Sequence, residues 1–414
     1  MRETLQTPDP RLIEMDIPPI LSPVEIGRID RSLLPQMLNE ASLDPDHANR
    51  FMRLSILLYS LGSAELGLDM HLRALEYRRT FRYVCAQTPA IRLLAIMGAG
   101  GGLENAPVEY LLEGGDVQLD LLYVDEAGTL PDEVPDHDIA IIAMGESYQN
   151  KASLKALAIT FSNWPQPVIN QPLSVLNCSR DRLYNLLKGA ESLVVAETFC
   201  VSRGEISRVA FPRIVRPVDA HGGEGLEWID SDSMLKDYLE SRAEDAFYVS
   251  DYIDYASSDG LFRKARIALI DGRPYVCHLA ISDQWIVHYI PAGMEASEAK
   301  RLEERAFMET FDQVFVKIHG AALQEIHEKL QLDYVVLDCG ELADGRLVLF
   351  EADSRGWIHG VDPVDVFPYK SAIMQKAFDA FRALLSLRLQ FKPPTQSQAP
   401  ILPPSRQDDP SRMS

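Results

Sequence analysis

From Ile91 onward the chain alternates short apolar strands with helices, and this alternation restricts the fold more than any other feature of the sequence. The strand-like segments are RLLAIM, LDLLYV, DIAIIAMG and PVIN, and the helix-like segments between them are PVEYLLEGG and ASLKALAITF. Short apolar strands joined by helices are typical of a parallel sheet. We therefore expect an α/β fold class, with a small parallel α/β domain over residues 89–172.

The segments on either side of this domain differ from it in pattern. Residues 1–88 are expected to form a helical region, because residues from about 25 to 85 have heptad-like apolar spacing. Leu61, Gly62 and Ala74 give one helix pair a resemblance to a single tetratricopeptide (TPR) repeat, although a solenoid needs about three repeats. The pair could be a cap packed on the rest of the chain, a docking surface, or a contact with a second copy. Residues 391–414 are rich in Pro, Gln and charged residues and are expected to be a disordered tail.

The overall charge limits the classes of partner. The formal net charge of the 414 residues is −21, which excludes nucleic acid and anionic membranes as main partners, because both require a cationic surface. An anionic ligand must therefore meet a local concentration of positive charge. The five cysteines form no C-x-x-C pair, and no apolar run approaches the roughly 20 residues of a membrane helix. We expect a cytoplasmic protein.

Three segments in the second half carry residues suited to a magnesium nucleotide. FPRIVRPVDAHGGEGL contains Gly222, Gly223 and Gly225, where missing side chains let backbone N–H groups approach phosphate oxygens. DGLFRKARIALIDG places two cations, Lys264 and Arg266, on a strand-like segment. LDCGELADGRLVLFEADSRG suits two strands joined by a turn, with three carboxylates, a ligand type that Mg²⁺ prefers: Asp338, Glu351 and Asp353.

Taken together, residues 173–390 resemble an ATP-grasp domain, and residues 89–172 resemble the small α/β domain that precedes it. The resemblance is to the group of glutathione synthetase, D-alanine ligase and the ribosomal-protein glutamate ligase. It is carried by NQPLSVLNCSRDRLYNLLKG, VAETFCVSR, IVRPVDAHGGEGLEWI, FYVSDYIDY, RIALIDGRPYV and LVLFEADSRG, in that order. The resemblance implies ATP and Mg²⁺ between two β-sheets, a carboxylate converted to an acyl phosphate, and attack by an amine to give an amide, ADP and phosphate.

The resemblance also implies roles for particular residues. Two arginines occupy the places of phosphate-binding lysines, and a loop matches the family's mobile phosphate lid: Arg182, Arg216, and Asp219 with Gly222, Gly223 and Gly225. The purine and ribose are assigned to Val249, Asp251, Ile253 and Asp254, with Asp259 as an alternative for the ribose. Among the expected catalytic residues, Arg266 matches the arginine that faces the γ-phosphate in these ligases. Lys264, which stands where glutathione synthetase has an acid, is expected to act through its charge, and His221 through its place in the glycine loop. The expected metal ligands are Asp338, Glu351 and Asp353, with Asp333 as a rival for the first.

Several alternatives stay open from the sequence. The substrates could be small-molecule or peptide carboxylates and amines. His278, Trp285, His288 and His359 could include a base for the amine or could be structural. A catalytically inactive nucleotide-binding scaffold is the second hypothesis. A third is an NAD-dependent oxidoreductase that uses the loop MGAGGG and Asp125, although the loop lacks the third glycine of the dinucleotide-binding fingerprint.

Overall fold

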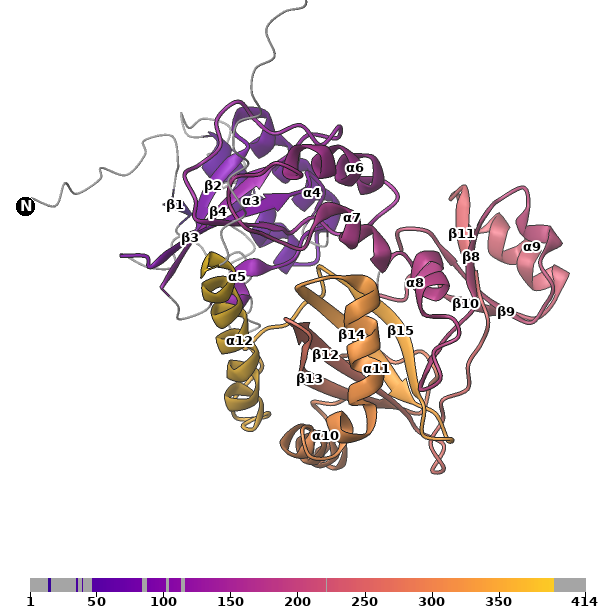
Figure 1. Ribbon diagram of the computed structural model, residues 1–414. Helices are drawn as coiled ribbons and strands as arrows, with labels where there is room; N and C mark the ends of the chain where they lie inside the picture. The colour runs from indigo at the N-terminus through magenta and orange to yellow at the C-terminus, as the bar shows by residue number, and fades with distance from the viewer. Residues whose placement is uncertain are drawn as a thin grey trace, which may run out of the picture.

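The computed structural model describes residues 14–15, 35, 39, 47–83, 88–101, 104–112, 116–220 and 222–390. Its α/β class, expected from the sequence, is confirmed: Figure 1 shows an indigo and violet sheet, a brown and orange sheet, and a smaller pink sheet, each with helices against it. The tail 391–414 and His221 lie outside the described residues. Within the described part, no helix has the length and apolar character needed to cross a membrane.

The first sheet has the strand order β1-β2-β4-β3-β5-β6, and β4, β3, β5 and β6 run parallel, as the alternation predicts. From the central β3 the chain crosses to β4 on one side and to β5 on the other. The carboxyl ends of β3 and β5 therefore lie where open parallel sheets bind ligands. The elements are β1 (Glu14–Met15), β2 (Thr80–Tyr83), β3 (Ile91–Met97), α5 (Val108–Leu111), β4 (Val117–Tyr123), β5 (Ile139–Ile142), α6 (Asn150–Phe161) and β6 (Val168–Ile169).

One face of this sheet is covered by α3 (His47–Ser60) and α4 (Ala64–Tyr77). Phe51 of α3 and Ala74 of α4 belong to the same buried cluster as Leu93 of β3, so the helix pair is a cap and the TPR resemblance is not confirmed. The expected helical region 1–88 is wrong at residues 80–83, which form β2 antiparallel to β4. Aromatic and β-branched residues such as those of TFRY favour strands. The helices expected before α3 lie almost entirely outside the described residues.

The pink sheet is antiparallel, with the order β10-β9-β11-β8, and α9 covers one face. Val215 and Val249 lie in the core with α9, so alternation along the strands turns Arg216 and Ser250 to the opposite face. The elements are α7 (Pro172–Val175), α8 (Arg180–Leu187), β8 (Thr198–Ser202), β9 (Arg213–Pro217), β10 (Glu227–Ile229), α9 (Asp232–Glu240) and β11 (Ala246–Ser250).

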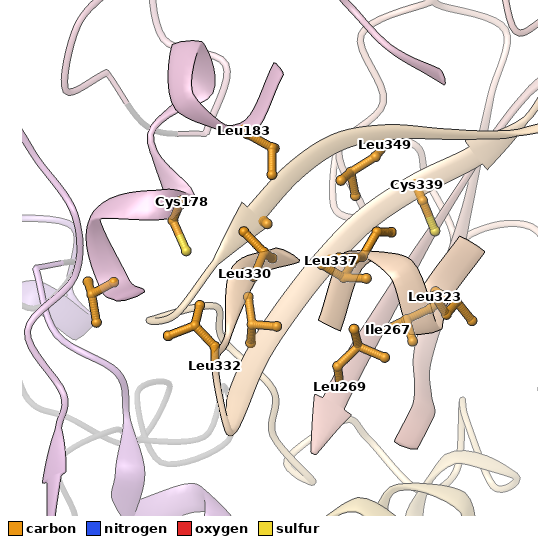
Figure 2. Packing of buried hydrophobic residues seen from close by; sticks show 14 of the residues in the cluster. Cys178, Leu183, Ile267, Leu269, Leu323, Leu330, Leu332, Leu337, Cys339 and Leu349 are labelled. Carbon is orange, nitrogen blue, oxygen red and sulfur yellow. The ribbon is translucent and has the colours of Figure 1, made fainter. Parts of the chain in front are cut away.

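The brown and orange sheet has the order β13-β12-β14-β15-β7. Figure 2 shows side chains of β12 and β14 in one apolar layer with Leu323 and Leu330 of α11. On the opposite face of this sheet, Val336 and Ile270 pack in the same apolar cluster as α12. Further along the strands, that face carries polar side chains. The elements are β7 (Leu193–Val195), β12 (Phe262–Ile270), β13 (Arg273–Ser282), α10 (Glu298–Thr310), α11 (Phe315–Leu330), β14 (Tyr334–Glu341), β15 (Leu347–Asp353) and α12 (Lys370–Gln390).

Helix α12 joins the first sheet to this one. Phe381 packs edge-on against Tyr334 of β14, with ring centroids 5.7 Å apart, and lies in the same cluster as the first sheet. Arg382 forms an ion pair with Asp116, just before β4, at 2.6 Å. This helix therefore shares a core with both sheets. The domain boundaries stay a prediction, because this core is continuous across them.

Candidate active site

A pocket of roughly 240 Å³ lies between the polar faces of the pink sheet and the brown and orange sheet. Four basic side chains line it, in a chain whose net charge is −21: Arg180, Arg216, Lys264 and Arg266. The carboxylates among its lining residues are Asp251, Asp338 and Glu351. The pocket therefore supplies the local positive charge that an anionic ligand needs.

A β-bulge brings the carboxylates of the hairpin to one face. Asp338 of β14 lies opposite Glu351, whereas its neighbour Cys339 lies opposite Leu349, so Phe350 is an extra residue on β15. Without the bulge, strict alternation would turn Glu351 to the same face as Leu349, which is buried against α11. The bulge reverses the phase, so Ala352 is buried and Glu351 faces the pocket.

Asp338 is held by the two cations of β12. Lys264 Nζ lies 3.0 Å from Oδ2, and Arg266 Nε lies 2.8 Å from Oδ1. Arg266 is directly opposite Asp338 in the strand register, so both charges sit on one face. The pKa of Asp338 is held well below its usual range by these two cations, which outweigh the opposing effect of burial. Both carboxylate oxygens thus already have partners.

Arg182, expected to contact phosphate, does not line the pocket. It is exposed on α8, and Arg180, the first residue of that helix, lines the pocket instead. Arg180 donates from Nη2 to Glu351 Oε1 at 2.7 Å and from Nη1 to the Phe350 carbonyl at 3.1 Å. Residues two apart on a helix point in different directions. Matching the segment two positions too far along therefore selected the exposed Arg182 instead of Arg180, which lies in the pocket.

The glycine loop joins β9 to β10 and lies over the pocket. Gly222, Gly223 and Gly225 all have positive φ, between 58° and 78°, which favours glycine. The Asp219 carboxylate accepts a hydrogen bond from the Tyr148 N–H at 2.7 Å, which ties the loop to the first sheet. Arg216, below the loop, donates from Nη2 to the Ala220 carbonyl.

Arg216 retains an unused donor. Its side chain is only 8% exposed, and its buried Nε has no hydrogen-bond partner among the described residues. Burial, and then the neighbouring charge of Arg180, lower the pKa of Arg216 to about 10, so the guanidinium stays charged at neutral pH. A buried cation with an unpaired donor favours binding of an anion at this point.

Of the expected purine and ribose residues, only Asp251 and Ile253 line the pocket. The side chain of Val249 is fully buried in the core against α9. Its expected contact with the purine is through backbone groups and stays a prediction. Asp254 is exposed and accepts a hydrogen bond from the Ala256 N–H, and Asp259 is paired with Arg263. Neither of these two acids lines the pocket, so the ribose contact stays unassigned.

The three expected metal ligands, Asp338, Glu351 and Asp353, line a second cavity of about 210 Å³ beside the first. Across the described ranges, no three His, Cys, Asp or Glu side chains form a group that could hold a metal ion as they stand. Burial, and also the charge of Glu351, raise the pKa of Asp353, despite the nearby Arg355. Repulsion between two hard-oxygen ligands on one strand fits a divalent cation at Glu351 and Asp353. Asp338 would join these two metal ligands only if Lys264 or Arg266 moved away from its carboxylate.

The first sheet contributes residues that the sequence did not single out. Glu146, at the carboxyl end of β5, lines a small cavity with Asp353 and Arg216, and burial raises its pKa to about 7. Arg355, on the loop after β15, lies 3.4 Å from Glu104 and occupies the space that a side chain at residue 145 would need. These long-range contacts have no local sequence signal.

The residues of the two alternative sites, the rival metal ligand and the dinucleotide loop, are engaged in other contacts. Asp333, the rival metal ligand, is bound by Arg388 at 2.6 Å and accepts from the Asn170 N–H. At the MGAGGG loop, Gly98 donates to Asn105 Oδ1 at 2.7 Å, which closes the turn on itself. Asp125 accepts from the N–H groups of its own turn at residues 127 and 129. These contacts favour a tight strand-to-helix turn over a dinucleotide site.

No protein-family model matches the sequence, and no curated protein matches it. Solved structures similar to the chain include a D-alanine–D-alanine ligase from Bacillus anthracis complexed with ATP, 16% identical with a TM-score of 0.45, over 73% of this chain and 99% of that chain. A D-Ala:D-Ser ligase from Enterococcus faecalis is 13% identical with a TM-score of 0.45, over 72% and 99% of the two chains. A RimK domain ATP-grasp protein from Sphaerobacter thermophilus is 15% identical with a TM-score of 0.40, over 70% and 99%.

Proposed function

We propose that the protein is an ATP-dependent ligase that joins a carboxylate to an amine through an acyl phosphate, with release of ADP and phosphate. The observation that carries the proposal is the pocket between two sheets, where four cations and the carboxylates of one hairpin meet beneath a glycine loop. Joining two anions, a carboxylate and ATP, requires mainly positive charge placed where the phosphoryl group is transferred.

The pocket residues divide into two groups by position. Arg180 and Arg216 lie at the side of the pink sheet and the glycine loop and would bind the phosphates. Lys264 and Arg266, which now neutralise Asp338, would face the transferred phosphoryl group and the substrate carboxylate. His221, expected in the same group, lies outside the described residues.

Magnesium is part of the proposal. Glu351 and Asp353 would hold the ion, and Asp338 would join them if Lys264 or Arg266 turned toward the ligand. Bound there, Mg²⁺ would neutralise charge on the phosphates and orient them. The substrates would be a small-molecule or peptide carboxylate and an amine.

The test is to trap the acyl phosphate. The protein is incubated with ATP, Mg²⁺, hydroxylamine and a panel of amino acids, dicarboxylates and short peptides, and hydroxamate and ADP are both measured. We expect hydroxamate in amounts equal to ADP with at least one carboxylate. If ATP binds but no carboxylate leads to ADP, the result would favour an inactive nucleotide-binding scaffold. The observation that supports this second function is that Lys264 and Arg266 both bind the Asp338 carboxylate.

A further inference from the structure

His288 follows β13 and lines the main pocket together with Gly222 and Gly223 of the glycine loop. Lys264 and Arg216, which also line the pocket, are among the charges that act on its ring. The sequence left a structural role open for this histidine, because an isolated histidine after a strand has no motif around it. Its surroundings in the pocket decide between these alternatives.

The glycine loop lies directly on the ring of His288. A methyl group at Gly223 would overlap the imidazole Nε2, and Gly223 also has a φ of 78°, so glycine is required there for two reasons. Gly223 belongs to the loop of the pink sheet, whereas His288 follows a strand of the brown and orange sheet. The contact is therefore one place where the two walls of the pocket meet.

The nitrogen under the loop is unused. Nε2 of His288 is buried and has no hydrogen-bond partner among the described residues. Burial, and then the charge of Lys264, lower the pKa of His288, so the ring is neutral at neutral pH. A neutral imidazole carries one N–H, and a buried polar atom in a native structure normally has a partner. A bound ligand can therefore supply the partner, to which Nε2 donates when the ring proton is on that nitrogen.

We propose that His288 donates a hydrogen bond from Nε2 to the terminal phosphoryl group of ATP, and so distinguishes ATP from ADP. This inference rests on the proposed function. In the transfer, an oxygen of the substrate carboxylate forms a bond to the γ-phosphorus while the bond from that phosphorus to the β–γ bridging oxygen breaks. The electron pair of the broken bond leaves with ADP. His288 keeps its proton throughout and holds an oxygen of the transferred group.

The test compares ATP with ADP and does not require the other substrates. Calorimetric titrations with each nucleotide and Mg²⁺ are made on the native protein, His288→Leu and His288→Gln. We expect His288→Leu to weaken ATP binding about tenfold or more and to leave ADP binding within about twofold, because a hydrogen bond to a charged oxygen is lost. Glutamine supplies an N–H near the position of Nε2, so His288→Gln should restore most of the ATP affinity.

The other outcomes separate the two proposals. Equal weakening for ATP and ADP, or no change for either, would overturn the role of His288 while the ligase proposal stands. If His288→Leu does not fold, the same comparison is made with His288→Gln and with His288→Asn, whose shorter side chain should not reach the phosphoryl group and should lose the preference for ATP. Native protein that binds neither nucleotide would overturn the proposed function itself.

Discussion

At the scale of single residues, the pocket is governed by how its buried charges are balanced. Asp338 is paired with both Lys264 and Arg266, and Glu351 is paired with Arg180. Each cation is therefore held in place by a carboxylate until an anion competes for it. This balance makes the effect of removing one charge predictable.

We expect Asp338→Asn to lower the free energy of unfolding by about 3 kcal/mol, because it leaves two largely buried cations without their counter-ion. The pKa of Asp338 is depressed in the folded protein, so its contribution is complete above pH about 4 and is lost as the pH falls toward the folded pKa. Urea unfolding measured from pH 7 to pH 3 should show a steeper loss for the native protein than for the variant. Asp344→Asn, in the exposed turn of the same hairpin, is the control and should change little; equal stability of both variants would contradict this account.

Arg180 lines the pocket, whereas Arg182, two residues further along the same helix, is exposed, so the two arginines can be compared directly. We expect Arg180→Met to weaken ATP binding about tenfold or more, because a charge-assisted contact is removed, while Arg182→Met leaves it unchanged. Calorimetry with Mg·ATP measures both. A larger effect of Arg182→Met would restore the residue expected from the sequence and remove Arg180 from the site.

At the scale of elements, strand alternation and the hairpin were predictable, and the irregularities were not. Asp338 and Glu351 were expected on adjacent strands because their spacing suits a hairpin, and the register confirms this. The bulge at Phe350 has no local signal, since it is set by which residues pack against α11. Arg180 was missed because matching α8 by motif fixes the helix but not which of two neighbouring arginines faces the pocket.

The glycine loop should act as a closing element only if Gly223 stays free of a side chain. We expect Gly223→Ala to weaken ATP binding about tenfold, because the methyl group meets His288 and the left-handed backbone is strained by about 1 kcal/mol. Gly204→Ala is the control, because a methyl group there has nothing within 4 Å. ATP titrations in which both variants match the native protein would show that the loop does not close on this surface.

The helix pair α3–α4 should be part of the fold rather than a separate docking unit. Phe51 is 5% exposed in the core, whereas Leu72 of α4 is 45% exposed. We expect Phe51→Ala to lower the free energy of unfolding by about 3–5 kcal/mol and Leu72→Ala by less than about 1 kcal/mol. Chemical denaturation checks this. A small effect of Phe51→Ala would mean that the helices are not needed to cover the sheet.

At the scale of the whole molecule, two sheets enclose the main pocket and the first sheet reaches the smaller cavity beside it through Glu146. Helix α12 links the first sheet to the brown and orange sheet. The periodicity of the sequence predicts each α/β unit, because every unit has its own local pattern. The contacts between units, such as Arg355 with Glu104 and Asp219 with Tyr148, join residues far apart in the chain and follow only from the folded arrangement. The surroundings of the pocket depend on such contacts, which is why the sequence does not identify the proposed substrates.

The central claim is that the pocket binds magnesium and ATP together. The most direct measurement is calorimetric titration of the full chain with ATP, with and without Mg²⁺, beside the variant Glu351→Gln. We predict binding that depends on Mg²⁺ and weakens about tenfold or more in the variant, because a carboxylate ligand of the ion is lost. Absence of ATP binding by the native protein, or equal binding by Glu351→Gln, would contradict the account.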